Sequence, residues 1–212
     1  MKTILCYGDS LTWGYDPSGP DRHAYADRWP SVLQAALGPD VTVIAEGLNG
    51  RTTAFDDHLG SADRNGARLL PTILTTHSPI DLVILFLGAN DMKPWIAGRA
   101  VASKQGMQRL IDIIRGHAYP MAEDAPDILI VAPPPLCETG DPDFAAMFEG
   151  GVEQSQMLAS FYSDLADVTA CGFFDAGSVA AASPIDGVHL DAVNSRAIGR
   201  GMEPIVRVML GL

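Results

Sequence analysis

The sequence predicts an α/β fold in which helices cover both faces of a parallel sheet. Two observations carry this prediction. Short apolar runs, typical of strands buried on both faces, alternate with longer segments of helical period. Several helical segments also end at Gly or Pro, which stop helices. In such folds the crossovers are right-handed and ligands bind beyond the carboxyl ends of the strands, so we expect the functional groups there.

Five apolar runs are the expected strands. They span residues 3–7, 41–45, 82–87, 128–131, and 173–174 with its flanks. Each run is short, rich in Val, Ile, Leu or Phe, and bounded by Gly, Pro or Asp, which favours a strand over a helix.

Helical spacing of apolar residues, three and four apart, marks the segments between these strands. The expected helices span residues 28–37, 67–76, 106–115 and 152–166. A closing helix is expected over 191–212, with Asp191 as its N-cap. Because Pro204 lies inside this last pattern and removes one backbone hydrogen bond, we expect a kink or a broken first half.

Two longer segments, 15–27 and 133–151, are rich in Pro, Gly and Asp and are expected to be irregular. Irregular segments of this length in a compact domain usually form functional walls or contact surfaces. At 212 residues we expect one domain spanning 1–212, since single cores stop growing at about 250 to 300 residues.

Composition excludes several classes of protein. The chain is 47% hydrophobic and 19% charged, as in soluble globular proteins, and no window approaches the roughly 18 apolar residues of a membrane helix. The first apolar run is too short for the signal-peptide core of about 7 to 15 residues, so we expect a cytoplasmic protein. A net charge of -12 without clustered Lys and Arg opposes nucleic-acid binding and favours a neutral small-molecule substrate.

No cofactor or metal is expected. The three cysteines, Cys6, Cys137 and Cys171, are odd in number and widely spaced, which favours buried reduced thiols over a disulfide framework or a zinc ribbon. The run Asp56-Asp57-His58 could suggest a metal site, but no paired ligand spacing supports it.

Polar groups follow the predicted strands where each strand ends. Ser10 follows the first strand, Gly50 the second and Asn90 the third, whereas Asp186 and His189 precede the closing helix. Because the carboxyl ends of parallel strands meet at one edge of the sheet, these groups are expected in one crevice.

This set of groups suits acyl transfer. A serine hydroxyl becomes a nucleophile when a base accepts its proton, and histidine has a suitable pKa. We expect Ser10 as nucleophile, His189 as base and Asp186 as the carboxylate that orients the imidazole. The Ser10 N–H, the Gly50 N–H and the Asn90 side-chain amide are the expected oxyanion donors. Taken singly, Ser10 and Gly50 would be turn residues and Asn90 an Asx turn.

At these residues the chain resembles the SGNH, or GDSL, hydrolase superfamily, whose four marker residues correspond to Ser10, Gly50, Asn90 and His189, with Asp186 as the acid of the triad. Further motifs resemble its bacterial arylesterase and acyltransferase branch: GDSLTWG at 8–14, EGL at 46–48 with RTT at 51–53, VAPPP at 131–135, FEGG at 148–151 and FDAGS at 174–178.

The resemblance implies a flavodoxin-like three-layer sandwich around a five-stranded parallel sheet. It also implies hydrolysis of small, short-acyl esters, with transfer of the acyl group to alcohols or peroxide in some members, and a homo-oligomer, from tetramer to octamer.

The chain departs from the family pattern at two positions. Gly50 replaces the alanine of some relatives, which leaves the N–H intact. Arg51 stands where many members have Asp, so the role of that Asp does not transfer. Asp91 receives no chemical step.

Two alternatives stay open. A carbohydrate acetylesterase would use the same triad on a sugar ester. A ligand-binding flavodoxin-like module would do no chemistry, although the absence of GxGxxG and GxxxxGK[ST] weighs against it.

The substrate pocket is the least determined part of the prediction. Trp13, Trp95 and the Phe144 to Phe148 segment could line the acyl or aryl pocket, and each could equally be core or interface. Asp9 is expected to orient the local backbone and does not act as a base. The residues expected to line the pocket are Asp9, Leu11, Trp13, Lys93, Trp95, Phe148 and Val188.

Overall fold

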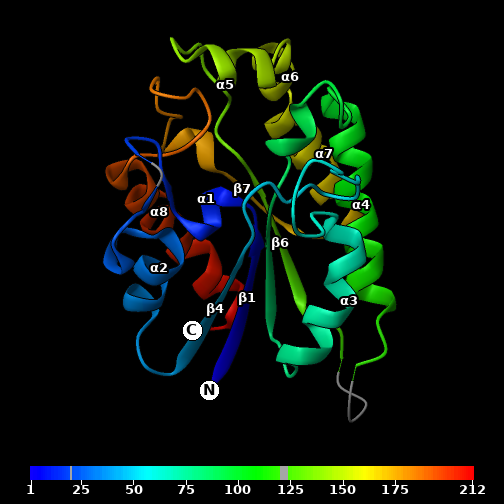
Figure 1. Cartoon of the computed structure of the whole chain (residues 1–212). Coiled ribbons are helices and arrows are strands. Elements are labelled where there is room, and N and C mark those ends of the chain that lie inside the picture. Colours follow the sequence, from blue (N-terminus) through cyan, green and yellow to red (C-terminus); the bar gives the residue numbers. More distant parts are fainter. Residues whose placement is uncertain (20, 120–123) are drawn as a thin grey trace.

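In a computed structural model, which describes residues 1–19, 21–119 and 124–212, five parallel strands form one sheet in the order β4-β1-β5-β6-β7 (Figure 1). The predicted strands and fold class are confirmed. The strands are β1 (Lys2–Gly8), β4 (Val41–Gly47), β5 (Leu82–Phe86), β6 (Asp127–Ala132) and β7 (Gly172–Asp175).

The winding of the sheet reverses at β1. The chain adds β4 on one side of this strand and then crosses to add β5 on the other, both in parallel. Such a reversal leaves a crevice between the loops that follow the two diverging strands. The loops after β1 and β5 therefore face each other at the carboxyl edge of the sheet.

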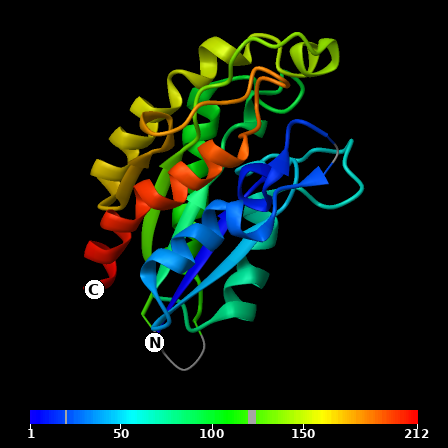
Figure 2. The same cartoon turned by 90° about the vertical axis from the view of Figure 1, so that its left-hand side faces the viewer.

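Helices cover both faces of the sheet (Figures 1 and 2). On one face α2 (Trp29–Leu37) packs against α8 (Ala192–Leu210), and the other face carries α3 (Gly66–His77), α4 (Ala100–Gly116) and α7 (Leu158–Thr169). Alternate residues of each central strand enter two different cores. This is why the strand sequences are continuous apolar runs without alternation.

Two helix predictions were wrong in their bounds because contacts from distant residues decide them. The predicted helix over 152–166 is two helices, α6 (Gly151–Ser155) and α7, with a break where the Ser155 hydroxyl accepts the Leu136 N–H at 2.9 Å. The helix predicted from 106 begins at Ala100, whose N–H is capped by the Gln154 side chain at 3.0 Å. Neither partner is near in the sequence.

The closing helix begins after Asp191, whose side chain accepts the Asn194 N–H, so the predicted N-cap is confirmed. The predicted broken first half is wrong, since α8 runs without interruption from Ala192 to Leu210. Pro204 lies on the exposed side of α8, and so does Arg200, the residue whose carbonyl loses its partner.

The two segments predicted as irregular contain short elements. The first, of which Pro20 lies outside the described residues, holds the β2–β3 ribbon and a 3₁₀ turn, η1. The second contains α5, which Asp141 caps by accepting two backbone N–H groups. This cap and the proline after it are a helix-start signal that the prediction missed. The bounds are β2 (Tyr15–Asp16), β3 (Asp21–Arg22), η1 (Tyr25–Asp27) and α5 (Pro142–Met147).

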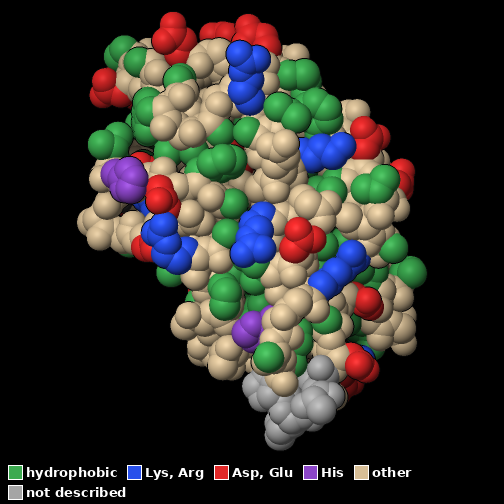
Figure 3. Space-filling model, turned by 90° about the vertical axis from the view of Figure 1, so that its right-hand side faces the viewer, with side chains coloured by type: hydrophobic (Ala, Val, Ile, Leu, Met, Phe, Trp, Pro, Cys, Tyr) green, Lys and Arg blue, Asp and Glu red, His purple; other side chains and the backbone are tan. Residues whose placement is uncertain are grey.

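The three cysteines are free thiols; Cys6 is buried, but Cys137 and Cys171 are only half-buried. Among the described helices, none is long and apolar enough to cross a membrane. On the face shown in Figure 3, Lys and Arg side chains are dispersed singly among acidic and uncharged ones.

Candidate active site

The residues predicted as the triad and the oxyanion donors lie together at the carboxyl edge of the sheet. Ser10 is the first residue of α1 (Ser10–Trp13), directly after β1, and Asn90 begins the 3₁₀ turn η2 (Asn90–Met92) after β5. A Cβ atom on Gly47 would lie 2.3 Å from the Trp13 nitrogen, so glycine at the end of β4 lets α1 pack directly on the strand.

A chain of hydrogen bonds joins the three residues predicted as the triad. His189 Nε2 lies 2.9 Å from Ser10 Oγ, and His189 Nδ1 lies 2.6 Å from Asp186 Oδ2. All three residues are buried, with exposed fractions of 7% or less. With the proton on Nδ1, held by the carboxylate, Nε2 is free to accept the proton of the serine hydroxyl.

The loop before α8 holds Asp186 in place. Asp186 Oδ1 accepts the backbone N–H groups of Val188 and His189, both at 2.9 Å. Burial opposes ionisation of Asp186, but the hydrogen bond and charge of His189 and the two N–H groups outweigh it and lower the pKa. This carboxylate is therefore ionised at neutral pH.

Two aromatic rings contact the imidazole. The Tyr15 ring lies over His189 with centroids 4.1 Å apart, and Phe144 meets it edge-on at 5.9 Å. Sequence analysis assigned no role to Tyr15, although it directly follows the turn at Gly14 that ends α1. Together the rings limit the orientations that the imidazole can adopt.

The three residues predicted to supply the oxyanion donors, Ser10, Gly50 and Asn90, line one cavity. Within the described parts of the chain, the backbone N–H groups of Ser10 and Gly50 have no acceptor. The Asn90 amide makes two long hydrogen bonds, at 3.2 Å to Asp9 Oδ2 and 3.3 Å to the Arg51 carbonyl oxygen. Such weak bonds leave the amide available to a stronger acceptor.

Two features of the fold favour glycine at position 50. Its φ of +80° is in the left-handed region, and an added Cβ would lie 2.6 Å from Arg64 Nε. The Arg64 side chain thus packs directly against this glycine, while its guanidinium binds Asp57 at 2.7 Å.

A cavity of about 200 Å³ opens at the Ser10 hydroxyl. Lys93, Phe148 and Val188 line it, as expected from the sequence. Phe144 and Met147, from the segment considered for the pocket, line it too, and so do three residues that sequence analysis did not assign, namely Tyr15, Asn49 and Arg64. Asn49 is adjacent to Gly50, but Arg64 reaches the cavity from a loop with no motif of its own.

Four residues expected in the pocket do not line this cavity. Asp9 turns back to accept the Leu11 N–H at 2.9 Å, which caps α1 and matches its expected local role. Leu11 packs in the core under α2 and α8, Trp13 packs against Arg22, and Trp95 is 49% exposed. Their nearness to Ser10 or Asn90 in the sequence does not place them at the substrate.

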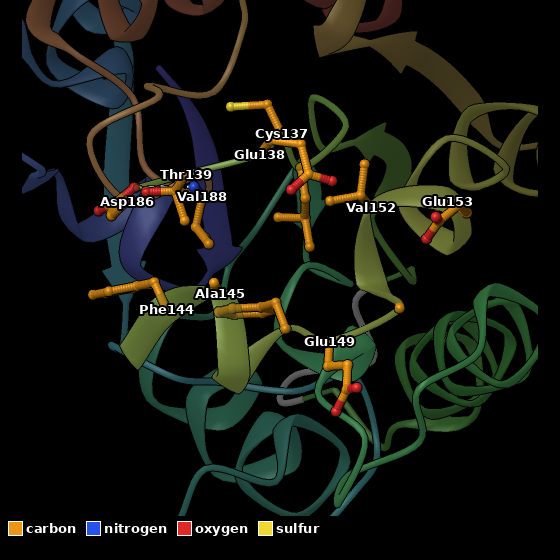
Figure 4. Close-up of a pocket in the computed structure, with 14 residues that line it drawn as sticks. Cys137, Glu138, Thr139, Phe144, Ala145, Glu149, Val152, Glu153, Asp186 and Val188 are labelled. Carbon is orange, nitrogen blue, oxygen red and sulfur yellow. Dashed lines mark hydrogen bonds between the residues drawn. The ribbon is translucent and has the colours of Figure 1, made fainter. Parts of the chain in front are cut away.

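A second cavity, of about 240 Å³, lies behind Phe144, Phe148 and Val188, which the two cavities share (Figure 4). Four carboxylates line it and no Lys or Arg does. They are Glu138, Glu149, Glu153 and Asp186.

Arg51 and Asp91 connect the loops around the site. Arg51 Nη1 donates to the carbonyls of Gly8, at 2.8 Å, and Glu46, joining the ends of β1 and β4. The buried Asp91 accepts the N–H and hydroxyl of Thr53 at 3.0 and 2.6 Å. Both residues therefore hold the framework on which Gly50 and Asn90 sit.

Burial raises the pKa of Asp91 to about 6, against the hydrogen bonds from Thr53, which lower it. Between pH 3.8 and about 6 the folded state therefore keeps a proton on Asp91 that the unfolded chain releases. The free energy of unfolding accordingly falls as the pH rises through this range. We expect Asp91→Asn to gain stability relative to the native chain by up to about 3 kcal/mol between pH 4 and 7. Urea unfolding of both proteins at pH 4 and pH 7 measures this difference. A difference in the free energy of unfolding that is the same at both pH values would contradict the prediction.

No group of three or more His, Cys, Asp or Glu side chains in the described residues could hold a metal ion. In the run considered as a metal site, Asp57 binds Arg64 and Asp56 binds Arg68 at 2.6 Å. These carboxylates neutralise arginines.

Comparison with known proteins places the chain among esterases. A carbohydrate acetylesterase family member from Sinorhizobium meliloti has 67% sequence identity and a TM-score of 0.99, with complete coverage of both chains. An aryl esterase from M. smegmatis has 41% identity and a TM-score of 0.94, and a second S. meliloti carbohydrate acetylesterase has 38% and 0.94; each comparison covers 99% of this chain and 100% of the other. No curated protein matches.

The model of one family, described as GDSL-like lipase/acylhydrolase, matches residues 6–194, which include every residue of the hydrogen-bonded chain and the three N–H donors. This range covers most of the sequence and agrees with the motifs that begin at Gly8. The chain belongs to the GDSL-like lipase/acylhydrolase family.

Proposed function

We propose that this chain is a serine esterase that hydrolyses small, short-acyl esters through an acyl-enzyme. The observation that carries the proposal is the chain of hydrogen bonds from Ser10 through His189 to Asp186, at 2.9 and 2.6 Å. The family and the aryl esterase and carbohydrate acetylesterase relatives support the same chemistry.

In the first half of the reaction Ser10 Oγ attacks the ester carbonyl carbon while His189 Nε2 accepts the hydroxyl proton. The oxyanion receives hydrogen bonds from the N–H groups of Ser10 and Gly50 and from the Asn90 amide, which gives up its long bond to Arg51. His189 then donates the proton to the leaving alcohol oxygen, and the C–O bond breaks. Asp186 stabilises the imidazolium throughout.

In the second half, water attacks the acyl-enzyme with His189 again as base, and Ser10 leaves with the returned proton. An alcohol or peroxide that replaces this water would receive the acyl group, which is the acyltransferase activity we propose as a side reaction. No step requires a metal or an organic cofactor, since the nucleophile, base and donors are all side chains or backbone groups of this chain.

A panel of acetyl esters tests the function. We expect hydrolysis of both phenyl acetate and 4-nitrophenyl acetate. With added ethanol, the ratio of ethyl acetate to acetate should be the same from both, because one acetyl-enzyme is partitioned in each case. Ratios that depend on the leaving group would contradict a shared acyl-enzyme. Much faster deacetylation of acetylated xylose oligomers would favour the second candidate, a carbohydrate acetylesterase, which two of the relatives support.

We also propose that the protein forms one domain, resides in the cytoplasm and assembles as a homo-oligomer of four to eight chains. Support for assembly comes from exposed apolar side chains on loops at the carboxyl end of the sheet, where Trp95 is 49% and Ile185 54% exposed. Burial between subunits would remove this apolar surface from water.

A further inference from the structure

Lys93 contributes a largely buried lysine side chain to the wall of the cavity at Ser10. Its residue is 6% exposed, and lysines are almost never buried unless they are paired. Within the described residues its ammonium group makes no hydrogen bond or ion pair, and Nζ lies 5.5 Å from the centre of the Phe148 ring. Burial lowers the pKa of Lys93, although the charges of nearby carboxylates, Asp57 first, oppose this effect. A negatively charged ligand would supply the missing partner.

The side chain belongs to the wall of the cavity at Ser10, and the charge of that wall is positive. In the described structure, Lys93 and Arg64 line this cavity and no Asp or Glu does. Arg64 forms an ion pair with Asp57 at 2.7 Å, whereas Lys93 forms no ion pair within the described residues, although the charge of Asp57 also acts on it. The adjoining cavity behind Phe148 carries four carboxylates instead (Figure 4). A negatively charged group is therefore favoured in the cavity at Ser10 and disfavoured in its neighbour.

The position of the cations identifies which half of the ester they face. His189 must donate a proton to the leaving oxygen, so the alcohol half lies at the imidazole, beside the rings of Tyr15 and Phe144. Lys93 and Arg64 lie on the side of the oxyanion donors instead. Lys93 follows the turn that begins at Asn90, and Arg64 packs against Gly50. This side is left to the acyl half.

We propose that Lys93, with Arg64 beside it, binds a negatively charged group on the acyl half of the substrate, and that the preferred substrates are half-esters of short dicarboxylic acids. The proposal rests on the serine esterase function above and narrows its substrate class. It departs from the neutral substrate expected from the net charge of -12, because the local charge of the cavity wall is opposite to that of the whole chain. A cavity of about 200 Å³ limits the acyl group to a few carbon atoms.

Two ethyl esters of matched size test this preference. Monoethyl succinate and ethyl levulinate share the ester and the chain length, and differ in ending in a carboxylate or a neutral acetyl group. We expect the native protein to hydrolyse monoethyl succinate with at least about tenfold higher kcat/KM, as a charge-assisted hydrogen bond would give. Lys93→Met should lose most of this preference, mainly through a higher KM for monoethyl succinate. Lys93→Arg should retain the preference.

Lys104→Met is the matched control. Lys104 Nζ also lies 5.5 Å from the centre of a phenylalanine ring, that of Phe161, but the residue does not line the cavity at Ser10. The ratio of kcat/KM for monoethyl succinate to that for ethyl levulinate should be the same in Lys104→Met as in the native protein. Far-UV circular dichroism and thermal unfolding of each variant separate a change of specificity from a loss of fold.

Three outcomes would overturn the proposal. The first is a native protein that favours ethyl levulinate or hydrolyses both esters equally. The second is an equal loss on both esters in Lys93→Met, which would mean that the cation acts on the oxyanion. The third is a preference on the alcohol half alone, seen as faster cleavage of acetoxyacetate than of acetoxyacetone. Hydrolysis of ethyl levulinate that requires Ser10 would show that the esterase function stands even when the proposal fails.

Discussion

Replacing Ser10 by alanine is expected to lower kcat for phenyl acetate by about 10⁴ to 10⁶, to the level that binding and the oxyanion donors sustain without a nucleophile. Within the described residues the hydroxyl is the one group that bonds His189 Nε2, so its removal eliminates the acyl-enzyme and leaves the rest of the site in place. Steady-state rates with phenyl acetate, together with mass spectrometry of the quenched reaction for an acetylated peptide containing residue 10, measure both consequences.

Ser61→Ala is the control for this experiment, because Ser61 is exposed and outside the cavity at Ser10. It should keep the native rate. Full esterase activity in Ser10→Ala would remove the basis of the proposed mechanism and would revive a ligand-binding module without chemistry.

Asp186→Asn is expected to lower kcat by about 10⁴ with the fold intact. The asparagine oxygen can still accept the N–H groups of Val188 and His189, which places the amide nitrogen against His189 Nδ1. An amide donates there where the carboxylate accepted. The imidazole proton then moves to Nε2, which can no longer accept the proton of Ser10.

The measurement is kcat and KM for phenyl acetate in Asp186→Asn, with thermal unfolding to report the fold. The expected loss is in kcat, because a wrong tautomer impairs proton transfer more than substrate binding. Asp164→Asn, on the exposed side of α7, removes one charge far from the imidazole and should keep the native kcat. A loss below about tenfold in Asp186→Asn would assign the orientation of His189 to its aromatic neighbours instead.

Long-range contacts set the limit of prediction from the sequence in both fold and site. The strand β5 was predicted because its five residues are all apolar, a property visible within the segment itself. The structure buries all five. The start of α4 was missed because its cap is the side chain of Gln154, 54 residues away. The cavity at Ser10 shows the same limit. Lys93, three residues after Asn90, was expected in the pocket, whereas Arg64 was not, because it reaches the cavity only by packing against Gly50.

By itself the sequence determined the five strands of the main sheet, the family, and the five residues whose groups suit acyl transfer. These depend on apolar periodicity and short motifs, which are local and can be read without coordinates. The tertiary structure alone decided that Ser10 Oγ and His189 Nε2 lie 2.9 Å apart across 179 residues of chain, and that Arg64 packs on Gly50. It alone also put Lys93 in the wall of the same cavity, with no ion pair to the other described residues. Such distances and fields arise only when loops from separate strands meet at the sheet edge, because charge and hydrogen bonding act through space rather than along the chain.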